Sequence, residues 1–567
     1  MRFQDIPYQR PNKTEALRQY DAILEKLATA KSAADQLSAF SDYQLLSREL
    51  STQGTVCMIR HTIDTRDAFY DKENDFFDAA GPVFSEKQTA IYQELLKSPY
   101  RPQLEEKLGR TLFEKLDLAA RSMNPAVTGL MQEENALESE YQKLYASAKI
   151  EFQGASLTLP QLGAFKQNPD RAVRRAAVEA EGAWFDAQRE QLDSLYSRMV
   201  QNRTAQALKM GFESYTPLSY LRMGRAGYGR AEVEEFRRQV KQDWVPLAAR
   251  VKGFQRARIG VDALRLYDDG LSFAGGNAKP RGTPEELLSR AAEMYHALSP
   301  ETGEFIDFMC QNGLFDLVSK PGKAPGGYCT YIPGYQSPFV FSNFNGTAAD
   351  VDVLTHEAGH AFAAYRAAKK NLPVELEEAT MEACEVHSMS MEFFTSPWHG
   401  LFFGEDAPRY QLQHAEEAVT FIPYGCMVDE FQHLCYDQPH LTPEERNALW
   451  LELEKQYRPW LDLSGLPFYG RGAGWQRQLH IYECPFYYID YCLAQTLALQ
   501  FFALSLKDAD AAWQKYLAFV DLAGSESYTG LGRKAGLALP FDRGCMKQVG
   551  EAIEAWIAAR QPGAPQA

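Results

Sequence analysis

The sequence lacks an excess of positive charge, a long apolar run near its start, and internal repeats. Its 59 lysines and arginines are outnumbered by 75 aspartates and glutamates, so the formal net charge is −16. Nucleic acids and anionic membranes bind basic surfaces, and we therefore expect neither as a partner. We also expect no export signal, because no apolar segment follows Arg2 in the opening residues.

Cysteine pairs at the CxxC spacing are absent as well, although the chain contains nine cysteines. This odd, scattered set, without an expected export signal, predicts reduced thiols and a cytoplasmic location. The most apolar stretch, residues 484–506, includes Asp490, Gln495 and Gln500, whose side chains are costly in lipid. We therefore interpret it as a helix of the protein core. The sequence indicates no oligomeric state.

The composition that remains is that of a globular protein, with 45% hydrophobic and 24% charged residues. A length of 567 residues predicts more than one packed unit. Long amphipathic helices are indicated through the first third of the chain. One predicted helix begins at Asn168, the expected cap, with Pro169 in its first turn, and another spans residues 231–259.

A segment rich in glycine and proline interrupts this helical pattern at residues 320–347. It contains two runs typical of β-strands, at residues 328–332 and 338–344. Helical patterning then resumes at Ala348. The sequence therefore predicts a mainly helical protein with one small sheet.

The stretch "LTHEAGHAFA", residues 354–363, contains an HExxH motif. If residues 349–368 are helical, His356 and His360 project from one face, a turn apart, and can reach one zinc ion. Glu357 leans over the same site, where it can take a proton from a water molecule. The alternative is a helix that carries two histidines on an exposed face.

Zinc needs a third protein ligand, and the segment at residues 375–394 offers several. The eligible residues are Glu382, Glu385, His387 and Glu392, and spacing alone does not choose among them. Asp352, one turn before His356, is a candidate partner for the second ring nitrogen of that histidine. A solvated carboxylate on the helix face is the alternative for Asp352.

These motifs resemble the thimet oligopeptidase and oligoendopeptidase F family of zinc peptidases, and the oligoendopeptidase F branch most of all. "HEAGHAFAAY" is followed by "EVHSMSMEFF", and the family likewise has its glutamate ligand on the next helix, seven residues before a second glutamate. Other resembling segments are "LRMGRAGYGRAEVEEFRRQV", "PFVFSNFNGTAADVDVLTHEAGH" and "HIYECPFYYIDYCLAQTLALQFF". The resemblance is strong from about residue 200 to residue 567, and general in character before that.

The resemblance implies one zinc ion per chain, bound by His356, His360 and Glu385, with Glu357 as general base. Glu392 is then not expected to be a ligand, and a carboxylate on the helix face is the plain alternative for it. It also implies a zincin-like catalytic region in which a small sheet lies beside the HExxH helix and helical lobes enclose a deep substrate channel. We expect an N-terminal helical lobe over residues 1–200 and a catalytic domain over residues 201–567.

A second group of polar residues lies near the C-terminal end, where Tyr487, Tyr488 and Tyr491 follow His480. If a helix begins near Pro485, Tyr487 and Tyr491 lie one turn apart on one face. Three tyrosines in a buried helix are, by themselves, more typical of a core. The family uses a histidine and two tyrosines here to stabilise an oxyanion, which implies His480 and Tyr491 together with Tyr487 or Tyr488.

The predicted function is a zinc endopeptidase that cleaves short unstructured peptides at internal bonds. The run at residues 338–344 is predicted to be an edge strand that pairs with the peptide backbone. One alternative is a dipeptidyl carboxypeptidase of the same chemistry, which would need a cationic clamp that the sequence does not reveal. Another is a zinc-containing peptide-binding protein without activity, although the presence of Glu357 disfavours it.

Overall fold

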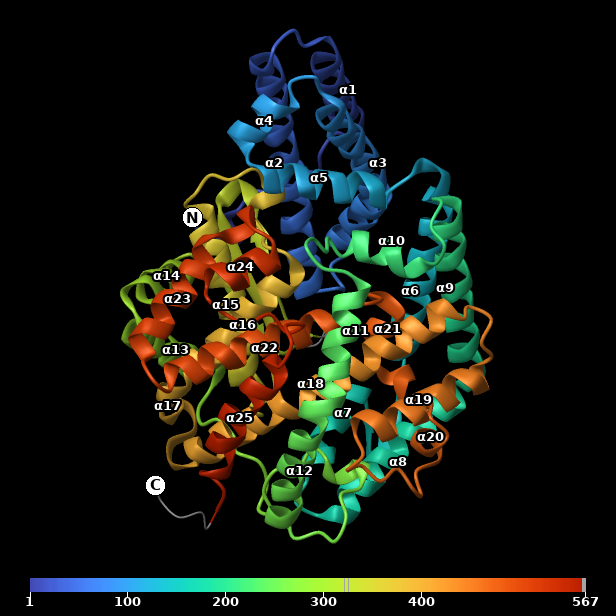
Figure 1. Ribbon diagram of the computed structural model, residues 1–567, viewed down its shortest axis with the longest axis vertical. Coiled ribbons are helices and arrows are strands. Elements are labelled where there is room, and N and C mark those ends of the chain that lie inside the picture. The colour runs from blue at the N-terminus through green and yellow to red at the C-terminus, as the bar shows by residue number, and fades with distance from the viewer. Residues whose placement is uncertain (321, 325, 563–567) are drawn as a thin grey trace.

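The computed structural model describes residues 1–320, 322–324 and 326–562, and its elements are mostly helices (Figure 1). This confirms the predicted mainly α fold. All nine cysteines lie in the described part of the chain and are free thiols. No helix in that part combines the length and the apolar character that a membrane span requires.

The N-terminal helices form a lobe at one end of the molecule, drawn in blue at the top of Figure 1. The lobe consists of α1 (Lys13–Thr29), α2 (Ala33–Ile63), α3 (Ala68–Lys97), α4 (Arg101–Leu108) and α5 (Arg110–Ser122). Side-chain caps start the first helices: Asn12 accepts a hydrogen bond from the amide of Glu15, and Ser32 from the amide of Asp35. The lobe has a core of its own, to which Leu376 is the contribution from later in the chain.

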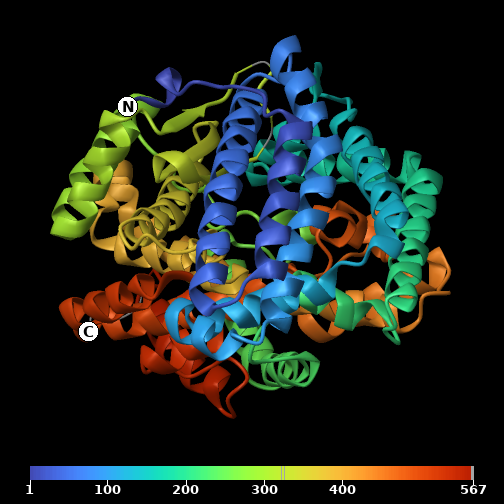
Figure 2. The same ribbon diagram turned by 90° about the horizontal axis from the view of Figure 1, so that it is seen from above.

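Helix α2 joins this lobe to the rest of the protein. The Thr62 hydroxyl is 2.6 Å from the Tyr328 hydroxyl, and Thr52 accepts a hydrogen bond of 2.7 Å from the amide of Gly334. Figure 2 shows the long blue helices lying over the middle of the molecule. The lobe is therefore tied to the segment that contains the predicted sheet.

The next part of the chain contains a short hairpin, β1 (Ile150–Phe152) and β2 (Ala155–Leu157), among helices. The helices are α6 (Thr128–Ala146), α7 (Leu159–Gly163), α8 (Arg171–Ala187), α9 (Arg189–Lys209), α10 (Tyr215–Arg222), α11 (Arg230–Gln239) and α12 (Val245–Ile259).

Two predicted helix limits in this part are wrong. The helix expected from Asn168 starts at Arg171, because Asp170 supplies the cap by accepting from the amide of Ala172. It ends at Ala187, and Gln188 separates it from α9. A single π-helical turn, Val240–Trp244, separates α11 from α12 within the predicted span 231–259. Residue 200 lies inside α9. The domain boundary that we placed near this residue remains a prediction.

The small sheet forms where the sequence predicted it, and it consists of β3 (Phe315–Val318), β4 (Tyr328–Ile332) and β5 (Ser337–Phe344). Its strand order is β3-β5-β4, with β5 parallel to β3 and antiparallel to β4. The prediction that residues 338–344 form the edge strand is therefore wrong. β5 is the central strand, and both of its edges are paired with neighbouring strands. β4 is the edge strand beside the predicted metal site.

The remaining helices form the larger part of the fold. They are α13 (Pro284–Leu298), α14 (Pro300–Gln311), α15 (Ala349–Ala368), α16 (Met381–Phe394), α17 (Gly400–Phe403), α18 (Ala407–Asp437), α19 (Pro443–Tyr457), α20 (Pro467–Gly470), α21 (Leu479–Glu483), α22 (Tyr488–Ser505), α23 (Ala509–Asp521), α24 (Tyr528–Lys534) and α25 (Cys545–Ala558). Helix α15 has the limits predicted for the HExxH helix.

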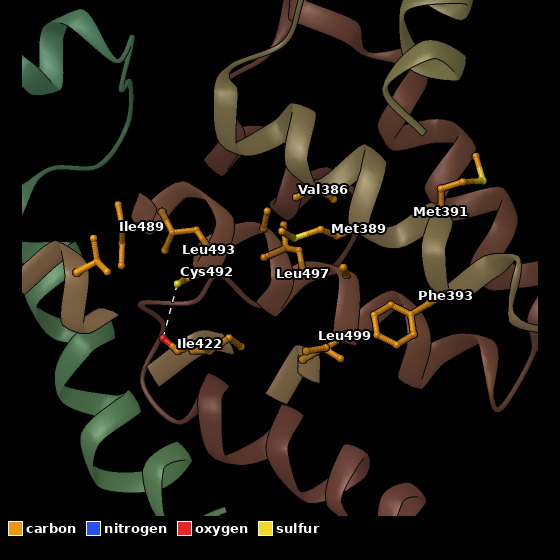
Figure 3. Packing of buried hydrophobic residues seen from close by; sticks show 14 of the residues in the cluster. Val386, Met389, Met391, Phe393, Ile422, Ile489, Cys492, Leu493, Leu497 and Leu499 are labelled. Atoms are coloured by element: carbon orange, nitrogen blue, oxygen red, sulfur yellow. Dashed lines mark hydrogen bonds between the residues drawn. The ribbon is translucent and has the colours of Figure 1, made fainter. Parts of the chain in front are cut away.

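Helices α15, α16, α18 and α22 pack together at the centre of this part. Figure 3 shows Val386 and Met389 of α16 against Leu493 and Leu497 of α22, with the Cys492 thiol directed at the carbonyl oxygen of α18 residue Ile422. The predicted core helix at residues 484–506 is thus α22, which confirms that interpretation.

Glycine allows α15 and α16 to approach closely. A Cβ atom on Gly359 would lie 2.6 Å from the Cα atom of Ser388, closer than real Cβ atoms come to backbone. Gly359 stands one residue before His360, and Ser388 stands one turn after Glu385. The close approach therefore brings the predicted ligands of two helices within reach of one another.

Candidate metal centre and the residues around it

Three predicted ligands converge between α15 and α16. The Nε2 atoms of His356 and His360 lie 3.3 and 3.6 Å from Oε2 of Glu385, and the ligand atoms of the three side chains all lie within 4.8 Å of one another. Two imidazole nitrogens and one carboxylate oxygen are a donor set that suits zinc and leaves a fourth position for water. The residues present therefore fit the metal that the motif implies.

Glu385 is the one candidate third ligand that joins the two histidines. Glu382 and His387 are also buried on α16, but they are not part of the converging group. His387 is two residues from Glu385 and so lies on another face of the helix, whereas Glu382 lies one turn earlier, near Arg225. Burial pushes the pKa of Glu385 upward, but the nearby His360 and His356 outweigh it and hold the pKa at about 2.

Glu392 is the residue that orients His356. Its Oε1 atom is 2.7 Å from Nδ1 of His356, and its Oε2 atom is 2.6 Å from Nε2 of His414 on α18. Nδ1 of His356 donates to this carboxylate, which leaves Nε2 free to bind a metal. Burial raises the pKa of Glu392, but hydrogen bonds from the two histidines bring it to about 2.

The proposed partner role of Asp352 is wrong, because its carboxylate accepts a hydrogen bond from Tyr410 and does not contact His356. Sequence reasoning considered Glu392 only as a ligand or an exposed carboxylate, and it did not consider His414. The family-like spacing from Glu385 to Glu392 is the signal that could have suggested a partner for His356.

Glu357 lies beside the converging ligands, and only 8% of its surface is exposed. A Cβ atom on Gly327, at the start of β4, would come within 3.8 Å of its Oε1 atom. Burial is the main cause that raises the pKa of Glu357 to about 7, with an opposing effect from His356. A carboxylate with a pKa near neutrality can both accept and return a proton.

A cavity of about 340 Å³ opens above these residues. Its walls come from β4, α15, α16 and the segment before α22, and they include His356, His360, Glu357, Tyr487 and Tyr491. Among the described residues, no other strand pairs with the outer edge of β4. The cavity therefore combines the metal-binding group with unpaired strand backbone.

The tyrosines of the second predicted group divide between two cavities. Tyr487 and Tyr491 line the cavity at the metal-binding group, whereas Tyr488 lines a neighbouring one. The Tyr487 hydroxyl donates a hydrogen bond of 2.7 Å to Oε1 of Glu385. Helix α22 begins at Tyr488, later than the predicted start at Pro485, so Tyr487 is the residue that caps it.

His480, on α21, is held in one tautomer by its neighbours. The Tyr424 hydroxyl donates to Oε1 of Gln478, which directs the Gln478 amide nitrogen at Nδ1 of His480, 2.8 Å away. Nδ1 is then an acceptor, so the proton is on Nε2, which lies 3.5 Å from the Tyr491 hydroxyl. Burial lowers the pKa of His480 to about 4, so the imidazole is a neutral donor.

The turn before Tyr487 has an unusual backbone. Phe486 has a φ of +67°, a left-handed conformation that costs a bulky residue energy. Its carbonyl oxygen accepts a hydrogen bond from Arg225, and its amide donates one of 3.2 Å to Gln432. Arg225 also forms a fully buried ion pair of 2.8 Å with Asp490. Sequence analysis assigned no role to Arg225, so this support was missed.

Comparisons with known proteins agree with this architecture. The family described as peptidase M3 N-terminal domain matches residues 3–123, and peptidase family M3 matches residues 164–551. The structure of PZ peptidase A with an inhibitor is 45% identical, with a TM-score of 0.94 and coverage of 98% of this chain and 99% of that one. No curated protein matches the sequence.

Two further solved structures carry the name oligoendopeptidase F. One is 46% identical with a TM-score of 0.94, and it covers 98% of each chain. The other, from Bacillus anthracis strain Ames, is 42% identical with a TM-score of 0.90 and covers 99% of this chain and 98% of that one. The fold and these likenesses define the protein as a peptidase. It belongs to peptidase family M3.

Proposed function

We propose that the protein is a zinc-dependent endopeptidase that hydrolyses internal bonds of short, unstructured peptides. The observation that carries the proposal is the convergence of His356, His360 and Glu385 beside Glu357 in one cavity. Zinc held by these ligands would act as a Lewis acid that activates water and polarises the scissile carbonyl.

Glu357 is the general base in this proposal. It accepts a proton from the attacking water and delivers it to the nitrogen of the leaving amine. Its pKa of about 7, raised by burial, suits both transfers. A binding protein without activity has no use for this carboxylate, which is why we favour the enzyme.

His480, Tyr491 and Tyr487 are the proposed donors to the oxyanion that forms when the carbonyl is attacked. Nε2 of His480 and the Tyr491 hydroxyl oxygen lie 3.5 Å apart, so both groups can face the same oxygen atom. Tyr487 is held in the same region by its hydrogen bond to Glu385, and its single hydroxyl proton would have to leave Glu385 to serve the oxyanion.

The outer edge of β4 is the proposed template for the substrate backbone. An extended peptide can add to this edge through main-chain hydrogen bonds, which read no side chains and so permit many sequences. The N-terminal lobe lies beside this strand, and Thr62 at the end of α2 contacts Tyr328 of β4. A folded protein cannot present an extended segment there, whereas a flexible peptide can.

A length series tests the proposal. Peptides that share one cleavable sequence, extended at both ends, should be hydrolysed rapidly when short and very slowly at the length of a denatured protein. Product sequencing should locate cleavage at internal bonds. Rates that hold steady up to protein length would contradict the enclosed site, and removal of two residues at a time from the carboxyl end would favour the dipeptidyl carboxypeptidase.

A further inference from the structure

A second cavity is larger than the one at the metal-binding group. A space of about 540 Å³ lies between α8, α18, α19 and the segment before α21. Aromatic side chains make much of its wall: Phe421, Tyr424, Trp450, Trp460, Tyr469 and Tyr488. The proposed reaction uses none of them.

One layer of side chains separates the two cavities. Tyr488 and Gln478 line the larger cavity, and both contact His480, at 5.0 Å between rings and 2.8 Å between hydrogen-bonded atoms. Phe421 also lines it, and its ring is 6.3 Å from that of Tyr491, which lines the metal cavity. The larger cavity therefore lies directly behind His480 and Tyr491, next to the cavity at the metal-binding group.

Arg477 presents a cation to this space. It lies three residues before His480, and 40% of its side-chain surface is accessible although the residue lines an interior cavity. Its Nε atom is 3.5 Å from Oε2 of Glu181, a long contact for an ion pair. Both oxygens of Glu181 have closer partners, because Lys166 binds Oε1 and the Tyr469 hydroxyl binds Oε2.

One carboxylate therefore serves two cations at this end of the cavity. The electrostatic effect is visible in Lys166, whose pKa is lowered by burial and by the charge of Arg477. A second carboxylate placed beside Arg477 would relieve this repulsion, and a guanidinium presents paired N–H donors that match carboxylate geometry.

The other cations of the cavity have carboxylates of their own. Lys252 is 2.6 Å from Asp269, and Nε of Arg458 donates a hydrogen bond of 2.8 Å to Glu454. Glu417 of α18 also lines the wall, and burial raises its pKa, which favours the neutral form. The unmatched positive charge is thus at Arg477, in a chain with a net charge of −16.

We propose that Arg477 binds a carboxylate of the peptide substrate in this cavity. The carboxylate is either that of the peptide's C-terminus or that of an aspartate or glutamate side chain beyond the scissile bond. The aromatic walls would hold the apolar side chains of the same segment. This inference rests on the proposed peptidase function, because it places the substrate across the metal site.

Matched peptides test the proposal and identify the source of the carboxylate. One pair differs only by amidation of the C-terminus, and a second pair differs only by glutamine in place of glutamate. The wild type should prefer the acid form of one pair by about tenfold to a hundredfold in kcat/KM, the range for hydrogen bonds to a charged group. Preference in the first pair assigns the terminus, and preference in the second assigns the side chain.

Arg477→Gln should abolish that preference, and Arg477→Lys should keep part of it. Arg250→Gln, which removes an exposed arginine paired with Glu554, is the matched control and should retain the full preference. Metal content and thermal unfolding show whether each variant is folded. Equal losses for acid and amide peptides in Arg477→Gln would overturn the proposal, as would a wild type without preference in either pair.

Binding measurements separate this inference from the proposed function. In a Glu357→Gln background, isothermal titration reports affinity for each peptide without hydrolysis. Tighter binding of the acid form that depends on Arg477 supports the carboxylate site even if the wild type cleaves no peptide. Equal binding of both forms overturns the site even if the wild type is an active peptidase.

Discussion

The two sides of the candidate site are built in different ways. On the metal side, two regular helices approach closely at Gly359, and the chain of hydrogen bonds from His356 through Glu392 to His414 orients His356. On the opposite side, Tyr487 follows a strained turn and not a helix. Helix packing thus positions the candidate ligands, whereas a buried ion pair and a strained residue position Tyr487, one of the proposed oxyanion donors.

This contrast predicts that changes on the two sides have separable effects, and Glu357→Gln should have the largest. We expect a loss of about 10²–10⁴ in kcat, the contribution of a general base, with metal still bound at one ion per chain. Metal analysis and hydrolysis of a fluorogenic peptide measure the two quantities. Loss of the metal together with activity would mean that Glu357 is a ligand.

Arg225→Met should disrupt the turn at Phe486 that positions Tyr487, because Arg225 binds the Phe486 carbonyl and pairs with Asp490. Removing one partner of a buried ion pair typically costs about 3–5 kcal/mol of unfolding free energy. Urea unfolding should show this loss, and the folded fraction should retain its metal but have a lower kcat, because Tyr487 is displaced. A folded variant with normal kcat would show that the Phe486 turn does not depend on Arg225.

Tyr491→Phe should remove one oxyanion donor at a cost of about 2.7–4 kcal/mol in the transition state. We expect kcat to fall by roughly a hundredfold to a thousandfold with little change in KM. Tyr488→Phe is the control, because its ring faces the other cavity. If the two variants behaved alike, the assignment of the tyrosines to separate cavities would be without functional consequence.

Glu392→Gln tests the metal side with the smallest expected effect. Loss of a charged partner to a ligating histidine typically weakens metal affinity by about 10–100-fold. Competition with a chelator measures the change, and saturating zinc should restore hydrolysis. Asp352→Asn is the comparison, since Asp352 bonds Tyr410 instead of a histidine, and an equal loss there would contradict the orienting role of Glu392.

The sequence predicted features that depend on local signals. Helix α15 has the predicted limits because its apolar spacing and the HExxH motif lie within one segment. Both strands near it were also found, but their order was not, since pairing of β5 with β3 depends on distant residues. The break at Gln188 was not predicted, because it has no proline or glycine to mark it.

The candidate site shows the same division. Spacing alone left four candidates for the third ligand, and the family resemblance selected Glu385. The partner of His356 was missed because Glu392 lies 36 residues away and meets it only through the packing of α16 on α15. Arg225 was missed for a similar reason, as it is 265 residues from Asp490.

The bonds between α2 and the sheet have a mechanical consequence. Thr62 bonds to Tyr328 of the edge strand, and Thr52 bonds to the backbone at Gly334 just beyond it. A hinge that lifted the lobe would have to break these bonds or pull β4 away from β5. If a peptide pairs with β4 as proposed, the lobe and the strand that holds the peptide would move together. Opening the lobe would then weaken the binding of that peptide.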